Sequence, residues 1–508
     1  MRAPILLLLM AAVTASVPSS AQQALPAGGR DYFRPGFMVH APAAPWMYQQ
    51  TGDSRDNSSK GSFQLEFGRP VGGFSALGGF VKKLSGSTAA LDVVATVLPY
   101  AGRDRASLRE FLMQYGHRLE AEEIADASRR HYISHRLTET SLNGALCISR
   151  EAVVEDVGVP RHEGEAFTLT IHGLLCSHPE FPAYIIRDEY SMRLAPGEKL
   201  PDDAEGLAAR DSLKFRPLGY HVSFIPLGEL PQVAAEADGA IWATYGYQQG
   251  KVGRIDPKAN SVTAVVAVGR NPIGIAGYGG SLWVANSEDN SVSRIDPSTN
   301  KVTATIAVGA KPQFIVGHSG AVWVTLNGAG KVARIDPATG AVTEIGGVGE
   351  HPAGLAAMDG TIYVSDYGSG TISCIDPATN TVKGVLKGGP SSNFLLADKP
   401  YVWVNSQTKQ PAVLRFDPSK PESAAVRYGE VDYEPSGMAK WNGKLFVPNW
   451  VGASVSQIDP DNSSAQAILL PAGEAPIFAL SAQGSLWVVV SGAGRATLAY
   501  GILRFDAQ

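Results

Sequence analysis

The 508-residue chain lacks features that define several common classes of protein. It has three cysteines, so it does not carry the dense disulfide framework of small secreted domains. Its formal net charge is -5 and its lysines and arginines are scattered, which argues against nucleic acid as a partner. Beyond the amino terminus it has no apolar run long enough to cross a bilayer, so we expect no membrane span in the mature protein.

The long apolar run that the chain does have begins near its amino terminus. Met1 and Arg2 are followed by an apolar stretch from Ile5 to Ala15 and then by Ser19-Ser20-Ala21. A basic start, an apolar stretch and small residues before a cleavage point are typical of a secretory signal peptide, here residues 1–21. The sequence therefore predicts an exported protein, periplasmic or secreted.

The second half of the chain is built from one repeated unit. Arg-Ile-Asp-Pro occurs at Arg254, Arg294 and Arg334, with 40 residues between successive copies. Four degenerate copies follow, at Cys374-Ile-Asp-Pro377, Arg415-Phe-Asp-Pro418, Gln457-Ile-Asp-Pro460 and Arg504-Phe-Asp506. A period near 40 residues, with turns between short Val-, Thr- and Trp-rich runs, is typical of four-stranded blades around an axis. The sequence predicts a seven-bladed β-propeller over residues 219–508.

The aromatic and arginine residues of the repeat are interpreted as parts of this architecture. The second strand of each unit reads like Leu282-Trp283-Val284, with apolar residues on both faces. A strand between two adjacent blades is buried on both sides, so such residues are expected in the core without any ligand. The recurrent Arg and Asp, as at Arg254 and Asp256, are expected to stabilise the blade surface and its turn.

The two ends of the repeat region are predicted to close the ring. Residues 221–228 read like the fourth strand of a unit, whereas residues 502–506 read like a third strand with no fourth strand after it. Pairing these two segments completes the seventh blade and removes an exposed sheet edge.

The units Lys301–Gly309 and Ser281–Asn286, with the Ile-Asp-Pro turn, resemble the YVTN-type repeat of bacterial extracytoplasmic propellers over residues 221–508. The same broad group includes virginiamycin B lyase, a seven-bladed enzyme. The resemblance implies a His directly after the proline that starts a blade, and a Glu at the end of a second strand, as base and metal ligands. Here the residues after those prolines are Gln232, Ile273, Gln313, Ala353, Ser436 and Ile477, and the Glu is absent too.

The region before the repeats has a different composition. Residues 22–60 are rich in Ala, Pro, Gly, Gln and Ser, and we interpret them as an extended lead-in. In residues 61–218, Ala106–Glu122 has the apolar spacing of a helix, whereas segments such as Ala145–Val154 alternate like strands. These residues are predicted to form a separate, smaller α+β domain.

Cysteine and histidine residues supply few chemical candidates. Cys147 and Cys176 lie in predicted strands of the first domain, and we expect a disulfide between them because exported proteins meet an oxidising compartment. Cys374 is expected to be unpaired. His131 and His135 lack a recognisable third ligand, so a surface pair is favoured over a metal site.

In the ring, we interpret one end as the ligand face, where loops join strands two and three and join successive blades. Its candidate residues are Tyr245, Asn271, Asn286, Lys311, His351, Asp366, Asn393, Asn405, Glu434, Asn449 and Trp450. Asp366 and Glu434 are the candidate ligands for Mg²⁺ or Ca²⁺, because these cations prefer oxygen ligands. His351 and Asp366 are the candidate catalytic residues, because an imidazole beside a carboxylate can abstract a proton.

The sequence leaves two classes of function open. The first is a binding or scaffolding module for an envelope protein, a cell-wall component or a small ligand. The second is an enzyme: a divalent-cation-dependent lyase, as the resemblance implies, or a lactonase-like hydrolase. The first is favoured because the scaffold is evident while the catalytic residues that the resemblance implies are missing.

Overall fold

The chain divides into two compact units, Met1–Gly219 and Tyr220–Gln508. The computed structural model describes residues 22–24, 30–34, 36–41, 47–49, 69–71, 74–83, 88–98, 100, 104–125, 129–157, 165–198, 204–389, 391–407, 411–421, 423–428, 431, 434–450, 454–463, 468–471, 475–491 and 500–508. The predicted signal peptide lies outside them. Among them, no helix is both long and apolar enough to span a membrane.

The first unit is built around a nine-stranded antiparallel sheet. Its strand order is β1 (Gln22–Ala24), β4 (Met47–Gln49), β6 (Phe74–Lys83), β7 (Thr88–Val97), β11 (Phe181–Leu194), β10 (Phe167–His178), β9 (Ala145–Asp156) and β8 (Arg130–Leu142), and β5 (Arg69–Val71) pairs with β6. A three-stranded sheet has the order β12 (Lys214–Phe215), β3 (Phe37–Ala41) and β2 (Arg30–Arg34). The helices are α2 (Arg105–Glu123) and α3 (Ala204–Arg210).

The described parts of residues 22–60 belong to these sheets, which corrects their interpretation as a lead-in. Strand β1 pairs with β4, and β4 pairs with β6. Strand β3 pairs with β12, where Phe37 lies opposite Phe215. These strands are three to five residues long, and apart from the local pairing of β3 with β2 their partners lie farther along the chain. Such pairing leaves no local periodicity for a sequence pattern to detect.

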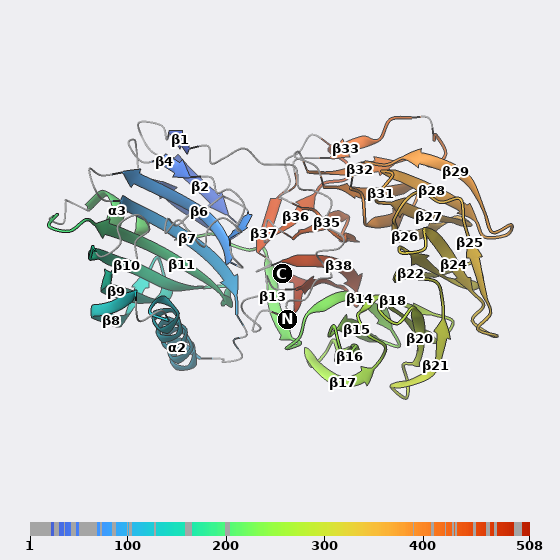
Figure 1. Cartoon of the computed structure of the whole chain (residues 1–508), viewed down its shortest axis with the longest axis horizontal. Helices are drawn as coiled ribbons and strands as arrows, with labels where there is room; N and C mark the ends of the chain where they lie inside the picture. Colours follow the sequence, from blue (N-terminus) through green and yellow to red (C-terminus); the bar gives the residue numbers. More distant parts are fainter. Residues whose placement is uncertain are drawn as a thin grey trace. The chain divides into compact units, whose positions relative to one another are not determined.

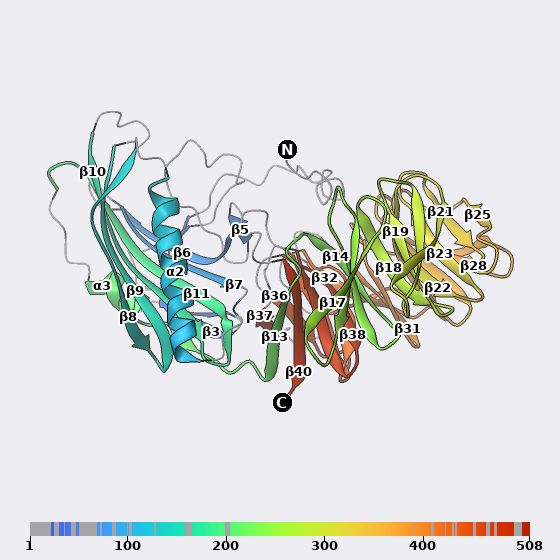
Figure 2. The same ribbon diagram turned by 90° about the horizontal axis from the view of Figure 1, so that it is seen from below.

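Helix α2 covers one face of the large sheet (Figure 2). It begins at Asp104, whose side chain accepts a hydrogen bond of 2.7 Å from the backbone N–H of Ser107. This capping satisfies a backbone donor that the first turn of a helix leaves free. The buried side chains of Leu112 and Leu119 pack with Ile148 and Ile185 of the sheet. The apolar spacing that predicted a helix therefore marks the face that the sheet buries.

The disulfide between Cys147 and Cys176 is present, as predicted. The two residues lie directly opposite one another on β9 and β10. His131 and His135 lie on strand β8, and each is within 3.5 Å of a carboxylate: His131 of Glu155, at 2.8 Å, and His135 of Glu120, at 3.3 Å.

The second unit is a seven-bladed β-propeller, as predicted, with four antiparallel strands in each blade. The first four blades are β14 (Pro231–Ala237), β15 (Ala240–Tyr245), β16 (Lys251–Asp256) and β17 (Ser261–Ala267); β18 (Pro272–Tyr278), β19 (Ser281–Asn286), β20 (Ser291–Asp296) and β21 (Lys301–Ala307); β22 (Pro312–His318), β23 (Ala321–Leu326), β24 (Lys331–Ile335) and β25 (Val342–Ile345); and β26 (Pro352–Met358), β27 (Thr361–Asp366), β28 (Thr371–Asp376) and β29 (Thr381–Lys387).

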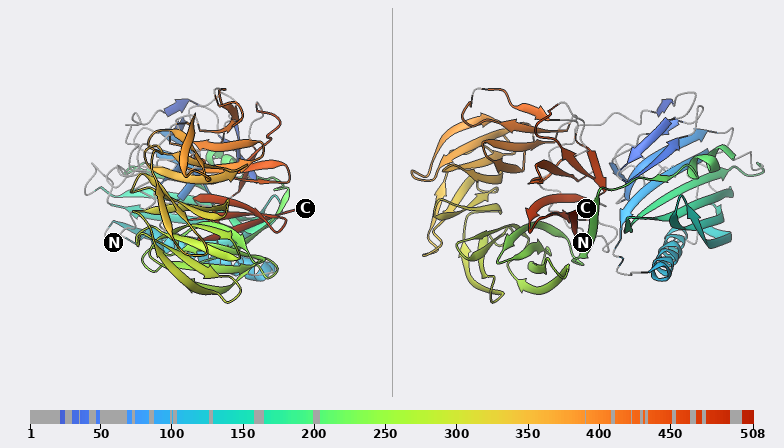
Figure 3. Two further views of the ribbon diagram at one scale, coloured as in Figure 1. Left: turned by 90° about the vertical axis from the view of Figure 1, so that its right-hand side faces the viewer. Right: turned by 180° about the vertical axis from the view of Figure 1, so that it is seen from behind.

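The last three blades are β30 (Leu395–Asp398), β31 (Tyr401–Ser406), β32 (Ala412–Phe416) and β33 (Val426–Tyr428); β34 (Ala439–Trp441), β35 (Lys444–Asn449), β36 (Ser454–Ile458) and β37 (Ile468–Pro471); and β38 (Pro476–Ala482), β39 (Ser485–Val490), β40 (Gly501–Ala507) and β13 (Tyr220–Pro226). Figure 1 shows the blades following one another around the ring with β14, β18, β22 and β26 on the inside, and Figure 3 shows the same ring from behind.

The ring closes within the seventh blade. Strand β13, from the start of the unit, pairs with β40 at its end, and Phe224 lies opposite Leu503. Arg504 on β40 also reaches the first blade, where its guanidinium donates to the carbonyl of Pro257 and to Asn260 Oδ1, the latter at 2.9 Å. Backbone pairing and a side-chain bridge thus join the two ends of the ring.

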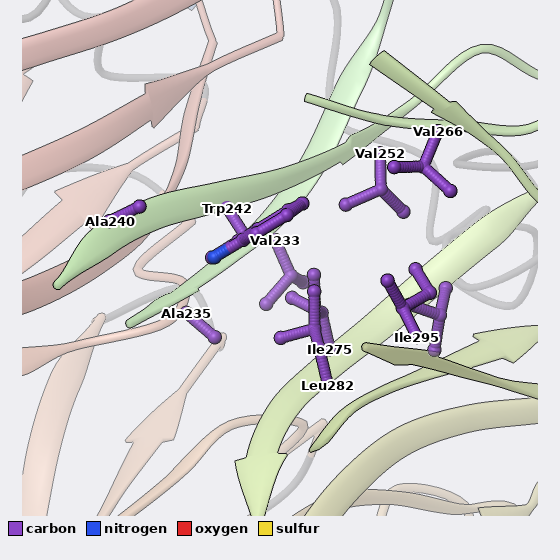
Figure 4. Packing of buried hydrophobic residues seen from close by; sticks show 10 residues of the cluster. Val233, Ala235, Ala240, Trp242, Val252, Val266, Ile275, Leu282 and Ile295 are labelled. Carbon is purple, nitrogen blue, oxygen red and sulfur yellow. The ribbon is translucent and has the colours of Figure 1, made fainter. Parts of the chain in front are cut away.

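Adjacent blades pack through the aromatic residues of their second strands. In Figure 4, Trp242 lies beside Val233, with Ile275 and Leu282 of the next blade below them, and these residues belong to one buried cluster. The recurrent arginines stack on tryptophans of their own blades, as Arg294 does on Trp283 with 5.2 Å between the guanidinium carbon and the ring centroid. These contacts agree with an architectural role for the Trp and Arg of the repeat.

Candidate functional site

A bulge at the start of the inner strands positions the residues of the candidate site. In blades one to four, the starting proline pairs with the end of the second strand, and the register then shifts before the fourth residue. The shift leaves backbone groups to be satisfied by side chains. The N–H of Phe314 donates to Thr325 Oγ1 at 3.0 Å, and that of Gly354 donates to Ser365 Oγ at 2.8 Å. These hydrogen bonds hold the bulge in one conformation, and the bulge in turn fixes the position of the residue whose N–H donates.

Asn405 of the fifth blade performs the same role with an amide. Its Oδ1 accepts hydrogen bonds from the N–H groups of Asn393 and Phe394, at 3.2 and 2.9 Å. Its amide nitrogen donates to Asn393 Oδ1 at 2.8 Å and to the carbonyl of Pro435. Two residues predicted to bind a ligand, Asn393 and Asn405, thus hold each other and the blade start in place.

One residue from each blade, the third when counted from the starting proline or from Ser392 in the fifth blade, contributes to a ring around the axis. In blade order they are Val233, Gly274, Phe314, Gly354, Phe394, Gly437 and Phe478. Three phenylalanines therefore alternate with three glycines, and one valine completes the set. Alternation of large and small residues lets side chains fill a narrowing channel.

The three phenylalanines meet across the glycine blades. The ring centroids of Phe314 and Phe394 are 5.1 Å apart, although a whole blade separates them in the ring order. Those of Phe394 and Phe478 are 6.3 Å apart. A Cβ atom at Gly437 would lie 2.4 Å from the Phe478 ring, and one at Gly354 would lie 2.6 Å from the carbonyl oxygen of Asn393. A side chain at either glycine would therefore clash with its neighbours, and the absence of one leaves room for the phenylalanine cluster.

A cavity of about 380 Å³ lies against this phenylalanine cluster. Its wall includes the residues that directly follow this ring in six blades: Ile275, Ile315, Leu355, Leu395, Met438 and Ala479. Each inner strand runs from the blade start towards its first hairpin, so these residues lie on the hairpin side of the cluster. The sequence interpretation put ligand binding at the opposite end of the ring. The structure instead places this cavity near the hairpins.

Most residues that line the cavity have apolar side chains, and charged groups line it where they still reach solvent. Asp398 at the end of β30 and Lys440 on β34 both line it, with 2.7 Å between the carboxylate and the ammonium group. Their side chains are 27% and 39% exposed, so both groups still reach solvent. Ser481 of β38 lines the cavity next to these blades. A few polar groups around an apolar interior are typical of small-molecule sites.

Four of the predicted face residues, Tyr245, Asn286, Asp366 and Asn449, occupy one equivalent position, the end of a second strand, and all are buried. The last three share one pattern of hydrogen bonds. Asn286 donates to Ser291 and Ser293 of the neighbouring strand, at 3.1 and 2.9 Å. Asn449 donates to two serines in the same way. Asp366 accepts hydrogen bonds from Thr371 and Ser373, at 2.9 and 2.7 Å. Within each blade, this shared arrangement joins the second strand to the third.

The carboxyl group of Asp366 is altered by its surroundings. Burial raises its pKa, and the hydrogen bonds that it receives from Ser373 and Thr371 partly offset this effect. Its side chain is directed to these hydroxyl groups within the blade, whereas His351 is exposed. The predicted catalytic pairing of His351 with Asp366 therefore has no support in their placement.

The predicted residues before the starting prolines share a backbone role. Asn271, Lys311, His351 and Glu434 all have φ between 50° and 55°. Their carbonyl groups accept a hydrogen bond from the residue that follows the second strand, as His351 does from Tyr367 at 3.1 Å. Positive φ at these four positions marks a turn that recurs before the blade starts. Trp450 supplies the N–H that bonds to Glu434, at 2.9 Å.

The remaining predicted face residues are held in protein contacts. Lys311 lies 2.6 Å from Glu288, on the loop after the second strand of the preceding blade. Tyr245 is buried at the end of β15, and burial raises the pKa of its phenol. Among the described residues, no group of three or more His, Cys, Asp or Glu side chains is arranged to hold a metal ion.

Sequence reasoning missed the phenylalanine cluster and its cavity. The signal was present, because aligning the blades on their starting prolines places Phe or Gly at the same position in six of seven units. The sequence analysis interprets the aromatic residues of the second strands and makes no prediction for these inner-strand positions. The contact of the phenylalanines across intervening blades depends on the diameter of the closed ring, which single units do not reveal.

Comparison with known proteins bears on the propeller. Residues 222–390, about a third of the chain, match the virginiamycin B lyase family. No curated protein matches the chain. Similar solved structures include Kuenenia stuttgartiensis hydrazine synthase (18% identity, 51% of this chain, 92% of that chain, TM-score 0.45), U3-55K (11%, 56%, 98%, 0.47) and BamB from Moraxella catarrhalis (13%, 55%, 83%, 0.38).

Proposed function

We propose that this protein is an exported binding module whose propeller holds a small, largely apolar molecule in the cavity on the hairpin side of the phenylalanine cluster. The observation that carries the proposal is the cavity itself, with an apolar wall, a volume of about 380 Å³ and a polar rim. Cavities of several hundred Å³ with these properties are the usual sites for small ligands.

The construction of the ring supports a preformed site. The glycine and phenylalanine positions are set by locked bulges and by close approach of neighbouring inner strands. A wall held in this way loses little conformational entropy when a ligand enters, which favours affinity. Export is supported by the predicted signal peptide and by the Cys147–Cys176 disulfide, because disulfides persist in oxidising compartments.

A lyase is the second candidate, and the match of residues 222–390 to the virginiamycin B lyase family favours it. Against it, the residues that follow the starting prolines provide no imidazole, and His351 and Asp366 are directed to different surroundings. The bulge positions instead hold residues such as Gln232 and Ala353, which are buried. The binding function therefore has the stronger geometric support.

The test is to measure binding of small aromatic and aliphatic molecules to the full protein by calorimetry or ligand-observed NMR. Ala397→Phe places a ring in the cavity wall and should abolish binding, since Ala397 lines the cavity. Lys311→Ala changes the opposite end of the ring and is the matched control, which should bind as the wild type does. Loss of binding in Lys311→Ala but not in Ala397→Phe would overturn the proposal.

A further inference from the structure

The cavity wall contains two kinds of group that attract the same type of ligand. The first is the cluster formed by Phe314, Phe394 and Phe478, which line the cavity. Aromatic faces carry partial negative charge, and they attract organic cations that have lost their water. A cavity that brings three such rings together is suited to a positively charged group with apolar substituents.

The second group is the carboxylate at the rim. Asp398 is the acidic residue among those that line the cavity, and its partner Lys440 carries a partly exposed ammonium group on the next blade. An entering cation can take the place of that ammonium beside Asp398, while the lysine side chain turns to solvent. Lysine tolerates this exchange because its long stem is flexible and its ammonium is strongly hydrated.

The hairpin end of the ring carries a net negative charge, like the carboxylate of Asp398. The inner strands and their hairpin turns carry four carboxylates and two lysines, namely Glu236, Asp238, Asp359, Asp398, Lys399 and Lys440, together with His318. Each lysine is already paired with a carboxylate, Lys399 with Asp359 at 2.8 Å and Lys440 with Asp398. Glu236 bonds instead to the uncharged amide of Gln483. The resulting excess of negative charge favours cations near the channel mouth.

From these observations we infer that the ligand is a hydrophobic organic cation, an ammonium compound with apolar substituents that contacts the phenylalanine cluster and ion-pairs with Asp398. The inference rests on the proposed function, because it assigns a chemical class to the ligand of the same cavity. It concerns binding alone and involves no covalent step.

The experiment compares two probes of equal shape on the full protein. Benzyltrimethylammonium carries the charge, and neopentylbenzene replaces its nitrogen by carbon. Calorimetric titration should give an affinity for the cation at least about tenfold higher than for the neutral probe. Phenylacetate, an anion of similar size, should bind more weakly than either.

Two rim variants then report the sign of the preferred charge. Asp398→Asn should weaken binding of the cation about tenfold, because the ion pair is lost. Lys440→Gln should strengthen it, because the competing ammonium is removed, and both variants should leave binding of neopentylbenzene unchanged. The melting temperature of each variant checks that the ring is intact. If the Asp398–Lys440 pair had a purely structural role, each variant would change the affinity for the cation and the affinity for neopentylbenzene in the same direction.

The outcomes separate this inference from the proposed function. Equal affinity for the two isosteric probes, with both lost in Ala397→Phe, would overturn the cation preference and keep the cavity as a binding site. Reversed signs, with Lys440→Gln weakening and Asp398→Asn strengthening the binding of phenylacetate, would show an anion site instead. Failure of every probe to bind would overturn both proposals.

Discussion

At the scale of single residues, position in the blade decides what a polar or small side chain does. Asn286, Asp366 and Asn449 were predicted to face a ligand, but each lies at the end of a second strand and bonds to hydroxyl groups of the third. The sequence showed that these residues follow an apolar strand. It did not show to which side the polar group turns, because that depends on hydroxyl groups five and seven residues later.

A glycine of the inner ring tests how tightly the channel is built. Gly354→Ala should destabilise the propeller by about 1–3 kcal/mol, because its Cβ would lie 2.6 Å from the carbonyl oxygen of Asn393 and 2.9 Å from Ser365 Oγ. Gly384→Ala in the same blade is the control, since a Cβ there meets no atom within 4 Å. Urea unfolding of both variants measures the difference. Equal stability of the two variants would show that the inner strands can shift to accept the added Cβ atom at little cost in free energy.

The raised pKa of Asp366 predicts a pH-dependent effect of its amide substitution. The folded state binds this proton more tightly than the unfolded chain does, so the native residue costs stability once it is ionised. Asp366→Asn should therefore stabilise the protein at pH 7 by up to about 1 kcal/mol, with partners like those of Asn286. The gain should vanish as pH falls through the raised pKa towards the ordinary range of aspartate.

Thermal or denaturant unfolding across this pH range measures the effect. The reverse change at the equivalent position, Asn286→Asp, is the matched variant and should lose stability at neutral pH. A gain for Asp366→Asn that stayed constant with pH would contradict the assigned cause.

At the scale of elements, local pattern predicted the strands that repeat and missed those that do not. The repeated second strands are an example, since Ser281–Asn286 has the same bounds in the structure as in the sequence analysis. Each contains alternating or continuous apolar residues between strong turn signals. The strands within residues 22–49 are only three to five residues long, and some of their partners, such as β6 and β12, lie elsewhere in the chain.

Closure of the ring can be tested at Arg504. Its guanidinium lies 5.1 Å from the centroid of Trp487 and also bonds to Pro257 and Asn260 of the first blade. Arg504→Ala should therefore cost about 2–3 kcal/mol, the sum of a stacked contact and charge-assisted hydrogen bonds. Arg334→Ala, at an arginine that lies 6.0 Å from Trp323 within its own blade, should cost about 1 kcal/mol or less.

Chemical denaturation of the two variants compares these costs. If Arg334→Ala were the more damaging, the contact between the seventh and first blades would contribute little to closure.

At the scale of the whole molecule, the repeat in the sequence was enough to predict the propeller and its seven blades. The arrangement inside the channel was not predictable from single repeats, since contacts such as Phe314 with Phe394 skip a blade. The sequence interpretation assigns ligand binding to the loop end of the ring, whereas the cavity on which our proposal rests lies near the hairpins. The cavity arises from the closed ring as a whole and not from any one unit.

The division into two units predicts independent folding of the propeller. Residues 220–508 expressed alone should give a soluble, β-rich protein with a cooperative thermal transition, because this unit contains all seven sheets of the ring. A shorter fragment from residue 227 lacks β13 and leaves β40 as an exposed edge, so it should aggregate or melt at a lower temperature. Circular dichroism measures the melting temperature of each fragment. Equal melting temperatures would contradict the closure of the ring by β13.

The location of a bound ligand tests the central claim most directly. Crystals of the full protein soaked with a bromine-labelled aromatic probe would reveal the bromine position by anomalous scattering. We expect a peak between the phenylalanine cluster and the Asp398–Lys440 pair, with loss of that peak in Ala397→Phe. A peak at the opposite end of the ring, beside residues such as Lys311 and His351, would contradict the account and restore the loop face as the site.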